Sequence, residues 1–122
     1  MPDRSYAIDA RSTDVFGRVL VSARDQHFIA DGPLQNGCPG EAVTPAELFL
    51  AGIATCAVEL VQVLAREQSR QVGGVSASIE GTIPAERIRE DVSIFSKVVL
   101  RFDFAGVGDE DAAALVEAFK GR

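Results

Sequence analysis

The sequence predicts an α+β fold with the element order βββ-α-ββ-α, in which antiparallel strands surround one buried central helix. Segments of alternating apolar and polar residues, typical of half-buried strands, lie on both sides of residues 44–65. That stretch, TPAELFLAGIATCAVELVQVLA, is apolar on nearly every side, as expected of a helix at the centre of a soluble assembly. Because the chain has 122 residues and no internal repeat, we expect a single domain over residues 1–122.

The N-terminal part of the chain predicts an antiparallel meander over residues 5–31. Three segments alternate between apolar and polar residues, and short turn-forming stretches separate them. In the first segment, Tyr6 and Ile8 share the face that we expect to be half-buried. The expected strands and turns are, in order, residues 5–12, 14–17, 18–24, 25–26 and 27–31.

A loop leads from this meander to the central helix, which we expect over residues 44–70. Residues 31–43 contain three glycines and two prolines. Thr44 is suited to the N-cap, Pro45 to the first helical position, and Glu47 lies at the spacing of a capping box. Two glutamates and a glutamine inside the apolar stretch argue against a membrane span.

The C-terminal part predicts two strands, residues 72–83 and 92–105, and a final helix, residues 109–121. The helix should be capped by Asp109 and begins with an acidic turn, which is favourable against the helix dipole. Its apolar residues recur at the spacing of a core-facing stripe. The apolar face of the second strand comprises Val92, Ile94, Val98, Leu100, Phe102 and Phe104, and the helix stripe comprises Ala112, Leu115, Val116 and Phe119.

Composition excludes several classes of function. The net charge of −6 gives no basic footprint for nucleic acid or an anionic membrane surface. The N-terminus lacks the apolar segment of a signal peptide, and two cysteines without such a segment indicate a reducing, cytoplasmic setting. The single His27 and the scattered carboxylates have no metal-ligand spacing, so we expect neither a metal nor another cofactor.

Cys56, in the middle of the expected helix, is the main candidate for chemistry. A lone cysteine on an apolar helix is usually a small core residue with an inert thiol. Cys56 also lies twelve residues beyond Thr44, too far along the helix to benefit from its N-terminus. A reactive thiolate at this position would need a nearby cation. On spacing alone, the inert and the reactive interpretation both remain open.

The segment PGEAVTPAELFLAGIATC, residues 39–56, resembles the signature of the OsmC/Ohr family of thiol-dependent peroxidases. Residues 24–33, RDQHFIADGP, are similar to the stretch that precedes the Gly-rich loop in the OsmC-like branch. The resemblance implies an intertwined homodimer with two sites at the interface. It also implies that Cys56 reduces organic hydroperoxides in oxidative stress defence, at the expense of an external thiol.

The resemblance suggests two further catalytic residues. Glu47 matches a carboxylate of the family motif, although the capping box explains the same residue without catalysis. For the arginine that would activate the thiolate, the candidates are Arg11, Arg18 and Arg24, of which we favour Arg24. Where the organic-hydroperoxide branch has a glutamate directly after the proline, this chain has Ala46.

The family's second, resolving cysteine lies on the last helix, where this chain has none. The other cysteine, Cys38, lies in the loop before Thr44. Cys56 is about 18 Å along the helix axis from Thr44, at about 1.5 Å per residue. A disulfide between Cys38 and Cys56 of one chain is therefore unfavourable, whereas a bond between two subunits stays open. We expect oxidised Cys56 to be resolved by an external thiol, or by a cysteine beyond Arg122 if the natural chain continues.

Two other functions remain open at this stage. One is a non-catalytic protein of the same fold that binds an apolar small molecule at the dimer interface, with Cys56 as a core thiol. The other is an α+β interaction subunit of a larger complex.

Overall fold

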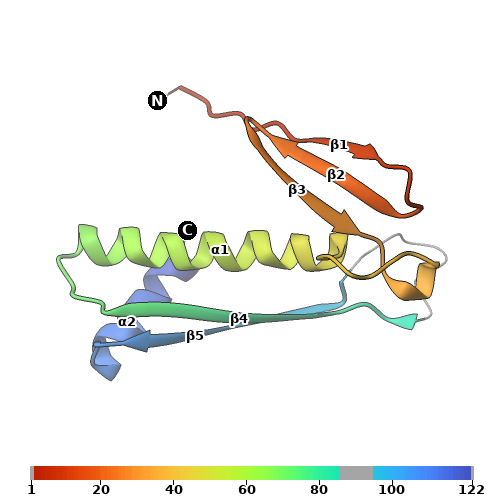
Figure 1. The fold of residues 1–122 in the computed structure, drawn as a ribbon. Coiled ribbons are helices and arrows are strands. Elements are labelled where there is room, and N and C mark those ends of the chain that lie inside the picture. Colours follow the sequence, from red (N-terminus) through yellow and green to blue (C-terminus); the bar gives the residue numbers. More distant parts are fainter. Residues whose placement is uncertain (1, 86–94, 122) are drawn as a thin grey trace. The chain divides into compact units, whose positions relative to one another are not determined.

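The computed structural model describes residues 2–85 and 95–121, and its element order is the predicted βββ-α-ββ-α (Figure 1). The chain divides into two compact units, Met1–Leu48 and Phe49–Arg122. The strands form two antiparallel sheets, one in each unit, so the expected fold class is confirmed while the sheet is not continuous. A short 3₁₀ helix, η1 (Leu34–Asn36), interrupts the loop that was expected to be irregular.

The first unit contains the predicted meander, with the strand order β1-β2-β3. β1 spans Asp9–Ser12, β2 spans Arg18–Ala23 and β3 spans Gln26–Asp31. Ala23 pairs with Gln26, so the second hairpin is closed by only two residues, Arg24 and Asp25. The expected turn at residues 25–26 is therefore wrong by one position.

The first strand is shorter than expected, because β1 begins at Asp9 rather than at residue 5. Asp9 pairs with Ser22, and β2 ends one residue later, where the chain turns. Residues 5–7 consequently have no position on β2 with which to pair. Tyr6 and Ile8, expected on a half-buried face, are 85% and 61% exposed.

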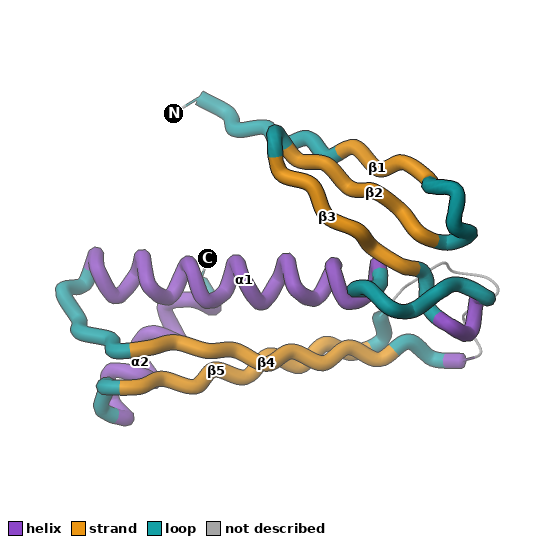
Figure 2. Tube along the Cα trace, viewed as in Figure 1, coloured by secondary structure: helices purple, strands orange, loops and turns teal. Residues whose placement is uncertain are grey.

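The second unit combines most of helix α1 (Pro45–Glu67) with strands β4 (Gly74–Thr82) and β5 (Lys97–Ala105) and helix α2 (Asp109–Lys120). In Figure 2 the two strands form a long hairpin that runs beside α1. They pair in antiparallel register from Gly74↔Ala105 to Thr82↔Lys97. Positions 92–94 of the expected strand lie outside the described residues.

Both helix ends of this unit differ from the expected ones. Helix α1 ends at Glu67 rather than at residue 70, because Ser69 takes a left-handed conformation (φ 54°) and the Arg70 amide donates to the Ala65 carbonyl at 2.8 Å. At α2 the N-cap is Gly108, without a side-chain hydrogen bond, and Asp109 is the first helical residue. The expectation that Asp109 caps this helix is wrong, although its carboxylate lies in the acidic first turn.

The core of the second unit lies between the C-terminal half of α1 and α2. Val61, Leu64 and Ala65 of α1 and Leu115 of α2 are buried together. From β5, Phe102 and Phe104 pack against this cluster. On the predicted apolar face of this strand, Leu100, Phe102 and Phe104 are half-buried, whereas Val98, expected on the same face, is 41% exposed. The residues packed against the cluster are Val72, Val75, Phe102, Phe104, Ala118 and Phe119.

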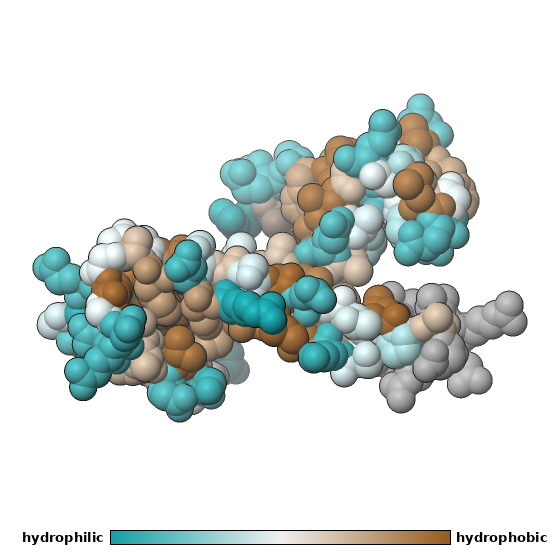
Figure 3. Space-filling model, turned by 90° about the horizontal axis from the view of Figure 1, so that it is seen from below, coloured by the Kyte–Doolittle hydropathy of each residue, from teal (hydrophilic) through white to brown (hydrophobic). Residues whose placement is uncertain are grey.

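Helix α1 is buried on one stripe only. Its buried residues, Ala57, Val61, Leu64 and Ala65, follow helical spacing, whereas Phe49 is 58% exposed. By length and composition α1 could cross a membrane, a test that the core helix of a soluble protein also passes. The expected burial on all sides is thus not reached within one chain. Figure 3 shows apolar, brown surface in both units among hydrophilic residues.

Replacing Leu115 by alanine should lower the free energy of unfolding by about 2–5 kcal/mol, because it leaves a cavity among fully buried neighbours. Leu34→Ala, the same change at a side chain that is 73% exposed, should cost less than about 1 kcal/mol. Urea denaturation at one fixed protein concentration measures both values. Equal losses in the two variants would contradict the assignment of the core.

Candidate functional site

The start of α1 is held by a capping box, as predicted. The Thr44 amide and hydroxyl both donate to Oε1 of Glu47, at 2.9 and 3.0 Å, and the Glu47 amide donates back to the Thr44 hydroxyl at 3.3 Å. The hydrogen bonds from Thr44 lower the pKa of Glu47. Glu47 therefore has a structural role that requires no catalysis, and its second carboxylate oxygen, Oε2, receives no bond in the described part of the chain.

A buried ion pair fixes the loop that leads to this helix. Asp31, at the end of β3, is fully buried and accepts two hydrogen bonds from the Arg18 guanidinium, at 2.8 and 2.9 Å. Its Oδ2 also accepts the backbone amides of Glu41 and Ala42, at 3.0 and 2.9 Å. Arg18 donates at 2.9 Å to Glu41 as well. These bonds tie β2, β3 and the loop into one cluster.

The electrostatics of this cluster follow from its hydrogen bonds. The Arg18 guanidinium, followed by the two loop amides, lowers the pKa of Asp31 well below its usual range against the opposing effect of burial. The two carboxylates in turn raise the pKa of Arg18. Sequence reasoning considered Arg18 only as an activating residue and missed its pairing with Asp31.

Cys38 fills a space that two glycines leave open in the same loop. A Cβ atom added at Gly17 or at Gly32 would collide with the Cys38 side chain. Gly17 also has a positive φ of 80°, which other residues rarely adopt. Cys38 is half-buried as a residue, and its Sγ donates to the Asn36 carbonyl at 3.8 Å. Cys38 is thus packed as a structural side chain of this loop.

Arg24, the favoured activating arginine, occupies the two-residue turn between β2 and β3. Its backbone is left-handed (φ 55°) and its side chain is exposed. Within residues 2–85 and 95–121, Arg24 makes no side-chain ion pair. Arg24 and Glu47 belong to the first unit, and Cys56 belongs to the second.

Cys56 lies on the side of α1 that the unit's core does not cover, and it is exposed. It borders an apolar groove of about 490 Å³. Six of the lining residues lie on one face of α1, and α2 contributes Phe119. The lining residues are Phe49, Gly52, Ile53, Cys56, Ala57, Leu60 and Phe119, none of which is charged. We refer to this space as the Cys56 groove.

Aromatic rings form two walls of the Cys56 groove. Phe49 stacks on Phe95, with ring centroids 5.6 Å apart and planes inclined by 21°. Phe119 meets Phe102 edge to face, with centroids 5.3 Å apart. The sequence assigned Phe119 to a core stripe, and nothing in its spacing indicated a place beside Cys56. Phe49 and Phe95 could not be paired from sequence, because 46 positions separate them.

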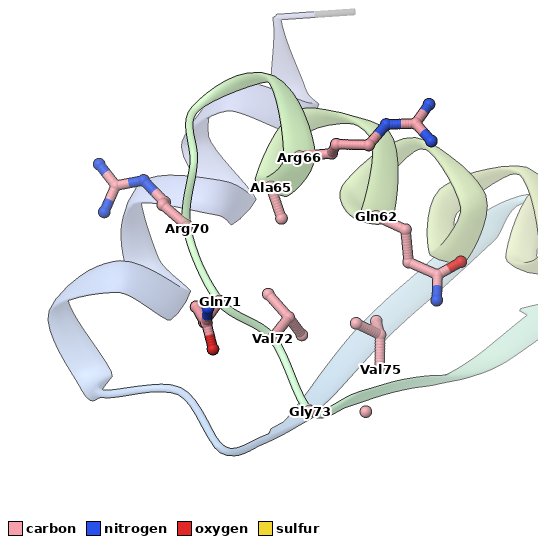
Figure 4. A pocket seen from close by; sticks show the side chains of 9 residues that line it. Gln62, Ala65, Arg66, Arg70, Gln71, Val72, Gly73 and Val75 are labelled. Carbon is pink, nitrogen blue, oxygen red and sulfur yellow. The ribbon is translucent and has the colours of Figure 1, made fainter.

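A second hollow, of about 360 Å³, lies where α1 ends and β4 begins. Its centre is apolar, with Ala65, Val72 and Val75 (Figure 4). Arg66 and Arg70 border it but point away in opposite directions. Arg70 donates to Gln68 and to Asp111. The cations of this hollow thus do not converge on a common point.

No group of three or more His, Cys, Asp or Glu side chains that could hold a metal ion occurs within residues 2–85 and 95–121.

Comparison with known proteins identifies the family. The family model for OsmC-like protein matches residues 38–122, and the chain therefore belongs to the OsmC-like family. This match includes the whole segment from Cys38 through α1 to the C-terminus. No curated protein matches the sequence.

Solved structures show the same fold at low sequence identity. An OsmC-like protein from Mycoplasma pneumoniae superposes with a TM-score of 0.83 at 12% identity, over 99% of this chain and 84% of that one. An organic hydroperoxide resistance protein OsmC from Legionella pneumophila gives 0.73 at 24%, over 98% and 84%. The organic hydroperoxide resistance protein OhrB of Bacillus subtilis gives 0.62 at 20%, over 95% and 83%.

The Asp31–Arg18 pair predicts a specific pH dependence of stability. Because folding lowers the pKa of Asp31, its carboxylate stabilises the protein fully above the unfolded-state pKa of about 3.9, and this contribution is lost as the pH falls further. Asp31→Asn should therefore be much less stable than wild type at pH 7, and the difference should shrink below about pH 4.

Chemical denaturation between pH 7 and pH 3 measures this difference. Asp3→Asn, at an exposed N-terminal position, is the matched control and should follow the wild-type curve. A constant gap between wild type and Asp31→Asn over the whole range would refute the role of the ion pair.

Proposed function

We propose that this protein is a thiol-dependent peroxidase that reduces organic hydroperoxides through Cys56, as a soluble homodimer of the cytoplasm in oxidative stress defence. One observation carries the proposal: the cysteine of the family's helix motif is exposed in a groove of apolar side chains. An inert core thiol would instead be buried. The names of the Legionella and Bacillus proteins, which refer to organic hydroperoxide resistance, support the same substrate class.

The proposed reaction has two stages. The Cys56 thiolate attacks the outer peroxide oxygen, so that an S–O bond forms, the O–O bond breaks and the leaving alkoxide takes a proton to become an alcohol. Cys56 is then a sulfenic acid. An external thiol displaces water from it to form a mixed disulfide, and a second external thiol restores Cys56 and leaves as a disulfide. The chain needs no metal or organic cofactor for either stage.

The position of the second cysteine supports an external reductant. Cys38 is packed between Gly17 and Gly32, where its side chain fills space that the loop otherwise lacks. Its reaction with another sulfur would require this packing to be broken. The wall that α2 gives to the groove is Phe119, which cannot resolve a sulfenic acid.

The positive charge that stabilises the thiolate must come from outside the groove lining, since no lining residue is charged. We assign this role to Arg24, which has no ion-pair partner within the described residues. Arg18 is less suited, because Asp31 and Glu41 already balance its charge. Glu47 would orient the arginine through Oε2, since both bonds from Thr44 use Oε1.

Homodimer formation is supported by the uncovered side of α1. This side is apolar, and in one chain it remains exposed around Phe49 and Cys56. A second copy would remove it from water, and obligate interfaces of this kind bury on the order of 2,000 Å² or more.

The alternative function is a non-catalytic protein that binds an apolar small molecule in the Cys56 groove at the dimer interface. The uncharged lining of the groove favours this alternative, because a peroxidase must hold a thiolate there.

Replacing Cys56 by serine should abolish hydroperoxide reduction with a dithiol reductant, a loss of at least about a thousandfold, because the proposed reaction requires the Cys56 thiolate to attack the peroxide. Cys38→Ser is the matched control and should retain most of the activity. Cumene hydroperoxide consumption measures both. Equal activity in Cys56→Ser and wild type would reject the peroxidase function and leave the binding of an apolar small molecule as the alternative.

Light scattering at micromolar concentration should give twice the chain mass. Leu60→Asp should unfold or aggregate the protein, because it places a carboxylate on the apolar side of α1 at a cost of several kcal/mol. The control is Glu59→Asp, on the exposed neighbouring position. A folded monomer of the wild type would contradict the dimer.

A further inference from the structure

Phe49 belongs to the face of α1 that carries Cys56. The two residues are seven positions apart, which is two helical turns, so their side chains emerge from the same side of the helix. Phe49 is 58% exposed, and an exposed side chain on a helix ordinarily samples more than one rotamer. Its ring nevertheless has a fixed partner, because it stacks on Phe95 in an offset geometry.

The Phe95 ring occupies space that is free only because residue 81 is a glycine. Its ring lies against Gly81 of β4, where an added Cβ would be 2.5 Å from both Cδ1 and Cε1 of the ring and 3.1 Å from Cδ2 of Leu50. Real Cβ atoms do not approach other heavy atoms to 2.5 Å, so any side chain at Gly81 would displace the ring.

The backbone beside Phe95 is anchored as well. The Ser96 amide and hydroxyl both donate to the Thr82 carbonyl, at 2.8 and 3.1 Å. Gly81 pairs with Val98 and Thr82 with Lys97, so Phe95 reaches back across the end of the hairpin onto β4. The ring thus lies against Gly81, and the chain beside it is anchored through Ser96.

We infer that Gly81 and Phe95 are positioning residues that act on the Cys56 groove through Phe49. Gly81 sets the place of the Phe95 ring, and the Phe95 ring fixes the Phe49 ring as a wall of the groove. A fixed aromatic wall two turns from the sulfur, about 10 Å along the helix axis, favours substrates whose flat apolar group extends along the groove away from the reacting atom. The effect on substrate choice rests on the proposed peroxidase function, whereas the effect on the shape of the groove does not.

The first test compares a bulky and a small oxidant in the Cys38→Ser protein. The measured quantity is the ratio of kcat/KM for cumene hydroperoxide to kcat/KM for hydrogen peroxide. This ratio should fall about five-fold in Gly81→Ala and in Phe95→Leu, because KM for the aryl substrate rises. Hydrogen peroxide, which is too small to touch Phe49, should react as in the parent. Gly74→Ala is the matched control on the same strand, because its Cβ meets only Ala105 Cβ at 3.7 Å.

The second test does not require peroxidase activity. In the same Cys38→Ser background, Cys56 is alkylated with N-phenylmaleimide and with N-methylmaleimide, which differ in the aryl group. The phenyl-to-methyl rate ratio should fall about five-fold in Gly81→Ala and Phe95→Leu and stay unchanged in Gly74→Ala. If the protein lacks peroxidase activity but the alkylation ratios change as expected, the proposed function is rejected and the inference about the groove is retained.

A double variant covers the case in which Gly81→Ala is poorly folded. Leucine lacks the ring that an alanine Cβ would meet, so Gly81→Ala should cost less stability in the Phe95→Leu background than in the parent. Additive losses would overturn the proposed seat of the ring. Unchanged maleimide ratios in folded Phe95→Leu, or an equal fall in Gly74→Ala, would overturn the inference as a whole.

Discussion

A helix of 23 residues with apolar side chains on nearly every side cannot be covered by 74 residues of one unit, and this constraint shapes the rest of the protein. The unit covers one stripe of α1, from Ala57 to Ala65, with α2 and the β4–β5 hairpin. Cys56 lies directly beside this stripe and outside it. The exposure of the thiol and the uncovered apolar surface of α1 therefore have the same cause within this unit.

The first unit fixes the residue at which this helix begins, after a glycine-rich loop. A flexible loop would give α1 a variable entry, but Asp31 accepts two loop amides and the Arg18 guanidinium at once. A buried carboxylate with four donors is tolerated because every bond offsets the cost of its burial. The loop that it fixes ends at Thr44, where the capping box begins the helix.

The elements that the sequence predicted well depend on short spacings. The capping box needs only three positions between Thr44 and Glu47, and the strand faces need only alternation.

The Arg18–Asp31 pair depends on register. A hairpin closed at Arg24 and Asp25 places residues 18 and 31 opposite each other. The turn expected one position later shifts every pair by two residues. Arg-Asp carries none of the Asn-Gly or Asp-Gly signals of a two-residue turn, so the register could not be read from sequence.

The candidate site was predicted only as far as its cysteine. Its walls come from chain segments that the register of the β4–β5 hairpin brings together. The Phe95 ring reaches Phe49 only because Gly81 has no side chain. An isolated glycine in a strand indicates a close approach of another group without indicating which group it is. In a groove without charged lining, such apolar contacts are the means by which this chain can choose among ligands. The proposed chemistry at Cys56 and the selectivity inferred around it therefore have separate origins: the former lies in the family motif on α1, the latter in residues that the motif does not include.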